Sequence, residues 1–171
     1  MVRIKATPEL IESLKNYLSI YNLGNRGVHD GNKQEQLIGL ISECIVIKYL
    51  TGKYPNLRDK PNGFDGGYDI ELKGIKIDVK TRGSVAYMQD DYMHNVFKVQ
   101  VNHNADVFIF CNYNRKTDVV EICGWISKQD FLQKAVLYPK GTIRINKSSR
   151  FTLKADNYEI ENQHLKDIKT L

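Results

Sequence analysis

The feature that most constrains this chain is a change in its hydrophobic period. Residues 68–72 alternate apolar and charged side chains, Lys73-Gly74 follows as a turn, and residues 75–80 alternate again. Alternation with a period of 2 on either side of a two-residue loop predicts an antiparallel β-hairpin. Because the preceding residues carry helical spacing instead, the sequence predicts an α/β protein, and a length of 171 residues favours a single domain over residues 1–171.

Two helices are expected before the hairpin. Thr7 and Pro8 are a typical N-cap and first helical residue, and they open an N-terminal helix over residues 8–22. A second helix is expected from Lys33 to Leu50, because Thr51-Gly52 ends a long run of apolar residues at helical spacing.

Further strands and helices are expected after the hairpin. The run 106–111 is almost wholly apolar, as in a central strand covered on both faces. Ser127 is placed to cap a helix that continues to about residue 136. Two more strands are expected, at 96–101 and 119–126. The chain is expected to end in a C-terminal extension of strand and helix over 141–171, with the helix at 161–171. The core of the domain would then be residues 33–136.

Charge and cysteine content narrow the class of protein. The chain has 25 Lys and Arg residues against 20 Asp and Glu, a net charge of +5, which suits a polyanionic partner without requiring one. Cys44, Cys111 and Cys123 lack the spacing of a zinc site or a disulfide framework, and they lie in apolar runs, so reduced core cysteines are expected. No signal peptide and no apolar stretch of membrane-spanning length is recognisable, so we expect a cytoplasmic protein with no membrane partner.

The polar face of the predicted hairpin carries an unusual set of charges. A two-residue loop pairs Glu71 with Lys76 and places Asp69 opposite Asp78. Two carboxylates that face each other across adjacent strands, with β-carbons about 5 Å apart, destabilise a sheet unless a cation lies between them. Mg²⁺ suits that position, because it binds one or two carboxylates together with water and phosphate. Lys80 is expected on the same face, where its ammonium would stabilise charge developing on a phosphate.

A plainer interpretation of these charges stays open, namely a solvated polar face. Short acid-x-lysine patterns are common, and the chain contains three, at 71–73, 78–80 and 167–169. Only the middle one is expected to have a carboxylate opposite it across a hairpin. The hairpin alone therefore does not separate a metal site from a solvated face.

Glu43 favours the metal site. It lies on the second predicted helix, where its neighbours at helical spacing are Gly39, Leu40, Val46 and Ile47. A glutamate on an apolar face needs a cationic partner, because burying an unpaired charge is costly. Gly39 would let another backbone or a ligand approach the helix closely. The partner of Glu43 is then either the same metal ion or a lysine or arginine.

These segments resemble the PD-(D/E)xK nuclease superfamily, which includes restriction endonucleases, archaeal Holliday-junction resolvases and small phage nucleases. The resemblance spans roughly residues 33–136 and rests on the helical segment 39–43, on Gly67-Tyr68-Asp69, and on the sequence Asp-Val-Lys-Thr-Arg at 78–82. It implies a restriction-endonuclease-like fold, in which a helix, an antiparallel hairpin and further strands build a mixed sheet flanked by helices.

The resemblance also implies a site. Asp69 and Asp78 would be metal ligands, the carbonyl of Val79 a further ligand, Lys80 the catalytic lysine, and Glu43 an acid that the helix adds to the same metal. The chain departs from the family pattern at two positions, since Gly-Tyr stands before Asp69 where the family name has Pro, and Asp78 replaces the more usual Glu.

Other residues are weaker candidates. Asp65 competes with Asp69 as the first acid, although the two glycines after it favour a loop residue. Aromatic residues after the hairpin have the chemistry to stack on bases, although an ordinary structural role explains them equally well; they are Tyr87, Tyr92, His94 and Phe97. Basic residues expected around the site and suited to phosphate contact are Arg26, Lys33, Lys53, Arg58, Lys60 and Arg82. The histidines lack metal-ligand spacing, so zinc is not expected, and Trp125 is expected in the core.

The function expected from these residues is that of a Mg²⁺-dependent endonuclease that hydrolyses DNA phosphodiester bonds, with Mn²⁺ as a substitute metal. The DNA would be duplex or branched, and because cleavage of both strands usually needs two sites, a homodimer is expected. The alternative is a catalytically inactive DNA-binding or architectural protein that keeps the nuclease fold. If a virus encodes the chain, the expected compartment is the host cytoplasm.

Overall fold

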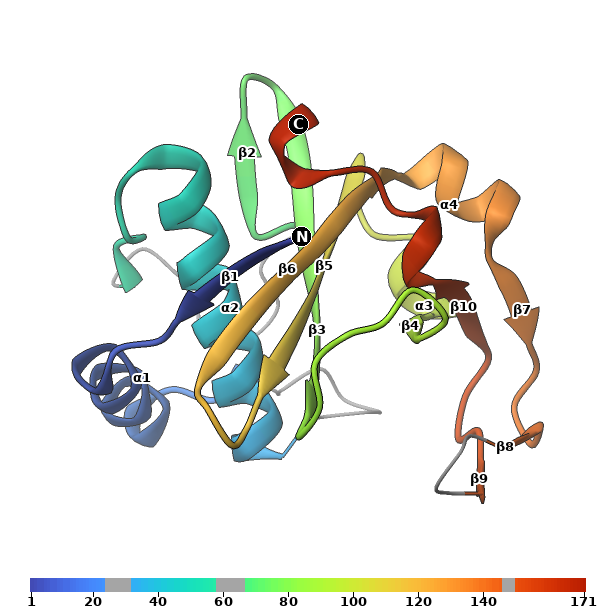
Figure 1. Cartoon of the computed structure of the whole chain (residues 1–171), viewed down its shortest axis with the longest axis horizontal. Coiled ribbons are helices and arrows are strands. Elements are labelled where there is room, and N and C mark those ends of the chain that lie inside the picture. Colours follow the sequence, from blue (N-terminus) through green and yellow to red (C-terminus); the bar gives the residue numbers. More distant parts are fainter. Residues whose placement is uncertain (24–31, 58–66, 146–149) are drawn as a thin grey trace.

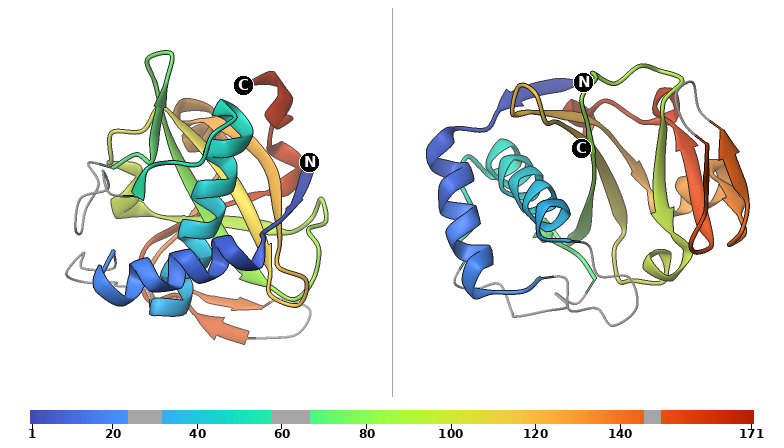
Figure 2. Two further views of the ribbon diagram at one scale, coloured as in Figure 1. Left: turned by 90° about the vertical axis from the view of Figure 1, so that its left-hand side faces the viewer. Right: turned by 90° about the horizontal axis from the view of Figure 1, so that it is seen from below.

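The computed structural model describes residues 1–23, 32–57, 67–145 and 150–171. Within these ranges the chain is arranged in three layers (Figures 1 and 2). Two helices lie against one face of a curled five-stranded sheet, and a three-stranded sheet with two short helices covers the other face. The protein is therefore a mixed α/β structure, as its change of hydrophobic period predicts.

The first layer consists of α1 (Pro8–Ile20) and α2 (Lys33–Thr51). The Thr7 hydroxyl accepts a hydrogen bond from a backbone N–H in the first turn of α1, which confirms the predicted N-cap. Asn32 caps α2 through a reciprocal capping box, and Gly52 ends the helix with a φ of 79°. The predicted bounds of α2 are thus nearly correct, whereas α1 ends two residues before the expected residue 22, because the next residue is already extended.

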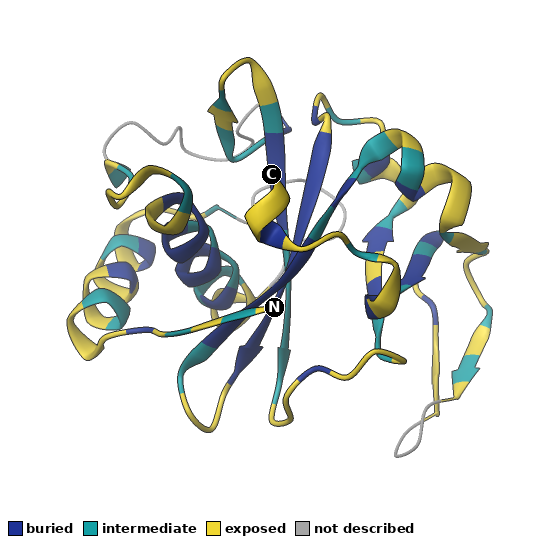
Figure 3. Cartoon of the chain, turned by 45° about the horizontal axis from the view of Figure 1, so that its top comes forward, coloured by how far each residue is buried: buried dark blue, intermediate teal, exposed yellow. Residues whose placement is uncertain are grey.

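The five-stranded sheet has the order β1-β6-β5-β3-β2. β3 and β5 are parallel, and every other neighbouring pair in this sheet is antiparallel, so the sheet is mixed. All the residues of β5 are buried, which confirms the prediction of a central strand (Figure 3). The strands of this sheet are β1 (Val2–Lys5), β2 (Ile70–Leu72), β3 (Ile75–Ser84), β5 (Val107–Asn114) and β6 (Val119–Ser127).

The third layer is built mainly from the C-terminal third of the chain. Its three-stranded sheet has the order β4-β10-β7, and β8 and β9 form a separate antiparallel pair. The elements are β4 (Met93–Phe97), α3 (Lys98–Val101), α4 (Lys128–Lys134), β7 (Val136–Tyr138), β8 (Ile143–Ile145), β9 (Arg150–Thr152), β10 (Asn157–Glu161) and the 3₁₀ turns η2 (Asn162–His164) and η3 (Ile168–Thr170).

Two apolar clusters fill the spaces between the layers. The first, here called cluster 1, joins α1 and α2 to one face of the five-stranded sheet, and Ile77, Val79 and Ile109 belong to it. The second, cluster 2, joins the opposite face to the third layer and contains Phe108 and Phe110. Figure 3 shows α1 buried on one side only, whereas the central turns of α2, which lies between α1 and the sheet, are buried nearly all round. Adjacent residues of β3 and β5 therefore alternate between two separate cores.

The three cysteines lie where the sequence predicts them. Cys44 and Cys111 belong to cluster 1 and Cys123 to cluster 2, and all three are buried free thiols. Burial raises the pKa of Cys111 and raises that of Cys123 to about 12, so both thiols stay protonated and unreactive at neutral pH. Among the described residues, no helix combines the length and apolar character that a membrane crossing requires.

Three predicted segments are wrong in detail. The strand expected at 96–101 ends at Phe97, because the ladder with β10 stops there and Lys98 begins a helical turn instead. The helix expected to continue to residue 136 ends at Lys134, where β7 follows. The tail 161–171 is not a helix but two 3₁₀ turns, because the backbone of Lys166 forms hydrogen bonds with that of Trp125 in both directions.

Candidate functional site

The hairpin forms in the predicted register. Ile70 pairs with Ile77, Glu71 with Lys76, and Leu72 with Ile75. The turn residues Lys73 and Gly74 have φ angles of 51° and 81°, the left-handed pair that a tight two-residue loop requires. The polar and apolar faces of β3 are therefore oriented as the alternation predicts.

Asp69 does not continue this register, so the expected pairing of Asp69 with Asp78 across the ladder is wrong. The backbone N–H of Asp69 donates to the carbonyl of Ile77 at 2.8 Å, although Ile77 is already the partner of Ile70. Two successive residues thus oppose one, as in a β-bulge. The Asp69 carboxylate turns to the edge of β3, where its Oδ2 accepts the Val79 N–H at 2.7 Å.

Asp78 and Lys80 form a close ion pair. Lys80 Nζ lies 2.7 Å from Asp78 Oδ2, and the Lys80 and Asp78 side chains are only 15% and 8% exposed. Both point away from cluster 1, because the alternating residues Ile77 and Val79 belong to that cluster. In the parallel register they stand beside Phe108 and Phe110 of β5, so the ion pair is shielded by apolar neighbours.

The two acids of the hairpin therefore approach one short stretch of β3 in different ways. Asp78 projects from the face of the strand, and Asp69 reaches its backbone edge. Since the N–H and C=O of one strand residue point to the same edge, the Val79 carbonyl is directed to the side on which Asp69 lies. Carboxylate and carbonyl oxygens are the donors that Mg²⁺ prefers, so the set formed by Asp69, Asp78 and Val79 fits this ion.

Glu43 lies on α2, which packs against the cluster 1 side of the sheet, and it is partly buried. Its helix thus covers the face opposite to the one from which Asp78 and Lys80 project. Within the described ranges, no three His, Cys, Asp or Glu side chains gather closely enough to hold a metal ion, so Glu43, Asp69 and Asp78 do not form a three-carboxylate centre. Gly39 has no described atom within 4 Å of the position of a Cβ, so no described backbone segment makes the close approach expected there.

The expected phosphate-binding residues fall into two groups. Arg26, Arg58, Lys60 and the competing acid Asp65 lie outside the described residues. Lys33 donates to the Leu18 carbonyl at 3.0 Å and so links α2 to α1, while Lys53 is exposed. Arg82 lies two residues beyond Lys80, donates to the Met93 carbonyl at 3.0 Å, and thus joins β3 to β4.

The aromatic residues after the hairpin take mainly structural positions. His94 is 2% exposed, and its Nε2 lies 3.0 Å from the Asn162 side-chain oxygen. Burial lowers the pKa of His94 to about 4, with the charge of Arg82 acting in the same direction and the hydrogen bond to Asn162 opposing it. The Tyr92 ring lies 5.9 Å from the Arg82 guanidinium, and Phe97 is partly buried; Tyr87 alone of the four is exposed.

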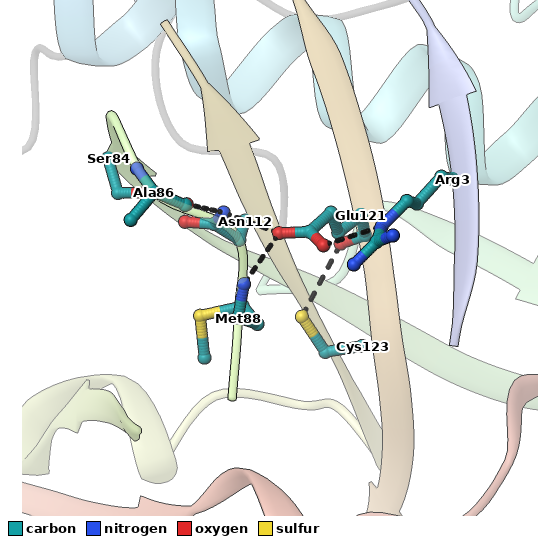
Figure 4. A network of polar contacts seen from close by, with 7 residues as sticks. All are labelled: Arg3, Ser84, Ala86, Met88, Asn112, Glu121 and Cys123. Atoms are coloured by element: carbon teal, nitrogen blue, oxygen red, sulfur yellow. Dashed lines mark hydrogen bonds and ion pairs between the residues drawn. The ribbon is translucent and has the colours of Figure 1, made fainter. Parts of the chain in front are cut away.

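A buried polar network near the end of β3 was not predicted (Figure 4). The Glu121 carboxylate has no exposed surface and accepts hydrogen bonds from Arg3 Nε, the Met88 N–H and Asn112 Nδ2 at 2.8–2.9 Å. Asn112 also donates to the Ala86 carbonyl at 3.1 Å. The network holds the segment that follows β3 against β1, β5 and β6. The one available signal is a glutamate inside the apolar run 119–126.

Trp125 is only partly in the core. Its ring packs against cluster 1, but its indole N–H donates to the Asp167 carbonyl at 3.1 Å, and Lys166 Nζ lies 4.8 Å from the ring centroid. The side chain therefore fastens the C-terminal segment to β6 rather than filling the interior.

Searches among protein-family models, curated proteins and solved structures found no match to this chain. The class defined by the structure itself is a mixed α/β protein with a hairpin that carries a buried Asp–Lys pair. Any assignment of activity therefore depends on the chemistry of the site.

Proposed function

We propose that this protein is a Mg²⁺-dependent endonuclease of restriction-endonuclease-like fold that hydrolyses phosphodiester bonds in DNA. The observation that carries the proposal is the Asp78–Lys80 pair on one face of β3, with the Asp69 carboxylate on the adjacent Val79 N–H. An acid, a lysine and a second acid converge on three consecutive residues of a strand. That donor set suits hydrolysis of a phosphate ester, and Mn²⁺ would substitute for Mg²⁺.

The roles proposed for the residues follow from their positions. A bound divalent ion would polarise the scissile phosphate and lower the pKa of a coordinated water. Asp69, Asp78 and the Val79 carbonyl would hold that ion. Lys80, released from Asp78 when the carboxylate turns to the metal, would place its ammonium against the charge that develops on the phosphate. Glu43 would contribute only after a shift that brings it to the other two acids, since the described arrangement keeps it apart.

A second candidate is a DNA-binding or architectural protein that keeps the nuclease fold without cleaving its ligand. This candidate is favoured by the internal contacts of the two acids. Asp78 is neutralised by Lys80, and Asp69 accepts the Val79 N–H, so both carboxylates already have partners without a metal ion.

Cleavage of supercoiled and linear DNA by the purified chain in Mg²⁺ or Mn²⁺ separates the two candidates. The nuclease is expected to convert the DNA and to lose at least about 10²-fold in rate in Asp78→Asn and in Lys80→Gln, because each removes a charge that stabilises the transition state. Asn and Gln are preferable to alanine, because each keeps a hydrogen-bonding group beside the remaining partner, which alanine would leave buried and unsatisfied.

Matched controls come from another acid-x-lysine pattern of the chain. Asp167→Asn and Lys169→Gln remove the same charges on the surface of η3, where Asp167 serves as a cap, and should leave cleavage unchanged. Circular dichroism and the melting temperature check that each variant is folded. DNA cleavage that persists in both site variants, or that is absent from the wild-type protein with either metal, would remove the nuclease assignment.

Metal binding offers a readout that does not depend on turnover. An ion that binds the folded protein alone raises its stability by about 1.4 kcal/mol at a tenfold excess over Kd. Mg²⁺ or Mn²⁺ should therefore raise the melting temperature of the wild-type protein and not that of Asp78→Asn. An equal rise in both proteins would place the ion elsewhere.

A further inference from the structure

Two hollows lie side by side around the short helix α3, in the third layer of the molecule. One, of about 310 Å³, is bordered by α3, α4 and β10, and the other, of about 240 Å³, by α3 and the segments before β8 and β10. Lys98, the first residue of α3, lines both. The two hollows therefore meet at Lys98, and they are here together called the α3 surface.

Positive charge dominates the α3 surface. Lys98, Lys128, Lys140 and Lys154 line it, and the one acidic residue among its lining residues is Asp156. The Asp156 carboxylate is engaged by the backbone N–H of Lys140 at 2.9 Å and by Lys98 Nζ at 3.4 Å. The hydrogen bond from the Lys140 N–H, the larger of these two causes, lowers the pKa of Asp156, so the group is ionised and the surface carries four cations against one anion.

Three of these lysines have no acidic partner in the described part of the chain. Lys128 Nζ donates to the carbonyl of His103 at 2.8 Å, while Lys140 and Lys154 are exposed and form no ion pair there. Like charges held near one another repel, and a polyanion that displaces its own counterions on binding relieves this repulsion. The charge pattern therefore fits a chain of phosphates better than a single small anion.

The α3 surface also carries aromatic side chains. Tyr158 lines the first hollow and Phe97 the second, and both are partly buried. The Tyr158 ring packs edge-on against Phe131, with 5.9 Å between centroids, which holds it in place. Cationic side chains interleaved with fixed aromatic rings are typical of surfaces that bind nucleic acids.

The α3 surface adjoins the candidate site. The chain leaves α3 through Asn102 and His103, and a Cβ placed on Gly67 would lie 2.7 Å from the Cβ of His103. Gly67 stands two residues before Asp69 in the sequence. The segment that leaves α3 therefore lies against the segment that leads into the hairpin.

We propose that the α3 surface is a track for the phosphate backbone of DNA, in which Lys98, Lys140 and Lys154 contact phosphates outside the cleavage site. The choice of DNA among polyanions rests on the proposed function. The contacts themselves require only the observed charges, so binding and cleavage are tested separately.

The test is equilibrium binding of the full chain to a fluorescently labelled DNA duplex, measured by anisotropy in EDTA so that no cleavage occurs. The variant Lys98→Gln/Lys140→Gln/Lys154→Gln removes three charges from the α3 surface. Its dissociation constant should rise at least about tenfold, and the slope of log K against log salt should fall by about 3, one for each phosphate that the variant no longer neutralises. Lys128 stays unchanged, because its hydrogen bond to His103 is structural.

A matched control removes the same charge elsewhere. Lys5, Lys15 and Lys116 are exposed on β1, on α1 and in the turn after β5. The variant Lys5→Gln/Lys15→Gln/Lys116→Gln has the same net charge, +5 less three, or +2, and should change the dissociation constant less than about twofold. Equal losses in the two triple variants would mean that only net charge matters and would overturn the proposal, as would unchanged binding in the α3 variant.

Failure of this inference is distinguishable from failure of the proposed function. DNA binding that depends on the α3 lysines, in a protein that never cleaves, supports the track and rejects the nuclease. If cleavage depends on Asp78 but DNA binding is unchanged in the α3 variant, the proposed phosphate track is rejected and the nuclease assignment is retained. Absence of DNA binding by the wild-type protein overturns the track.

Discussion

At the scale of single residues, stability depends on how each buried polar group is satisfied. Glu121 is a fully buried carboxylate that is met by three donors, and His94 is a buried imidazole that is met by one acceptor. The first group accepts its hydrogen bonds as a carboxylate, and the second is held neutral by burial. The two residues therefore remain buried for different reasons, Glu121 because hydrogen-bond donors surround it and His94 because it is neutral. Each gives a testable prediction.

Replacing Glu121 should destabilise the protein in proportion to the donors left unsatisfied. Glu121→Gln keeps one oxygen for the Met88 N–H and Asn112 but presents an N–H group to Arg3, so we expect a loss of about 1 kcal/mol in the free energy of unfolding. Glu121→Leu leaves the Met88 N–H buried without a partner, and the loss should be on the order of 2–5 kcal/mol. Urea denaturation measures both losses.

The control for this pair is Glu12, whose ion pair with Lys15 at 3.7 Å lies on the surface of α1. Glu12→Gln should change the unfolding free energy little, because exposed ion pairs contribute little. Stability of Glu121→Leu equal to that of the wild type would show that the network in Figure 4 is not important for the fold.

The buried His94 should make the folded protein sensitive to mild acid. The unfolded chain takes up a proton near the ordinary pKa of 6.5, whereas the folded protein does so only near pH 4. Stability is therefore fully present above the unfolded value and falls as the pH is lowered. From pH 7 to pH 5 the expected loss from this group is about 2 kcal/mol.

The variant His94→Gln, which keeps a polar side chain near Asn162, should abolish most of this pH dependence, whatever its effect on stability at pH 7. The matched control is His164→Gln, since that side chain is 46% exposed and lies 3.8 Å from Glu161. Unfolding by urea at pH 7 and pH 5 measures the difference. A wild-type pH dependence that survives in His94→Gln would assign it to other groups.

At the scale of elements, the hairpin was the most predictable part of the molecule. Its alternation and its Lys-Gly turn specify register, loop and faces locally, and all three agree with the structure. The position of Asp69 could not be predicted in the same way, because its bulge depends on a side-chain hydrogen bond to the Val79 N–H. The helix starts were predictable for the same reason as the turn, since capping residues act within one helical turn.

Elements held by distant contacts were missed or misassigned. β1 is only four residues long and exists because it pairs with β6, and the backbone hydrogen bonds of Lys166 go to Trp125. The segment 96–101 has apolar residues that fit either period, and the end of the β10 ladder decides between strand and helix. The local sequence pattern contains no information about such distant pairing partners.

The turn of the hairpin gives the prediction at this scale. Gly74 has a φ of 81° and open space where a Cβ would lie, so Gly74→Ala tests backbone conformation alone and should lower the unfolding free energy by about 1 kcal/mol. Gly39→Ala should have the opposite effect. Gly39 lies inside α2 with equally open space around it, so alanine there should raise the free energy of unfolding by about 0.5–1 kcal/mol. Thermal denaturation of both variants checks the signs, and a destabilised Gly39→Ala would mean that something else occupies that space.

At the scale of the whole molecule, the five-stranded sheet separates two cores, and the candidate site lies at its β2–β3 edge. The sequence was enough to bring Asp78 and Lys80 together, because residues two apart on a strand share a face. It was not enough to place Glu43, since the position of a helix over a sheet depends on packing along the whole interface. The network around Glu121 was missed because its members come from four parts of the chain.

A single hairpin site has one consequence for the assembly. Under the proposed function, one such site would cut one strand, and cleavage of both strands of a duplex or a branched junction would need two sites. We therefore predict that the protein is a homodimer under cleavage conditions, which sedimentation velocity in the presence of DNA and Ca²⁺ would detect. Double-strand cleavage by a species that stays monomeric with and without DNA would contradict this prediction.

The pairing of β1 with β6 also bears on how the protein emerges from the ribosome. Val2 lies opposite Ile122, so the first strand to be synthesised must wait for the last strand of its sheet. At about 5–20 residues per second, this delay is roughly 6–24 s. During that interval the apolar sides of α1 and α2 have no completed sheet to cover them, and the nascent chain is most exposed to chaperones and to misassembly.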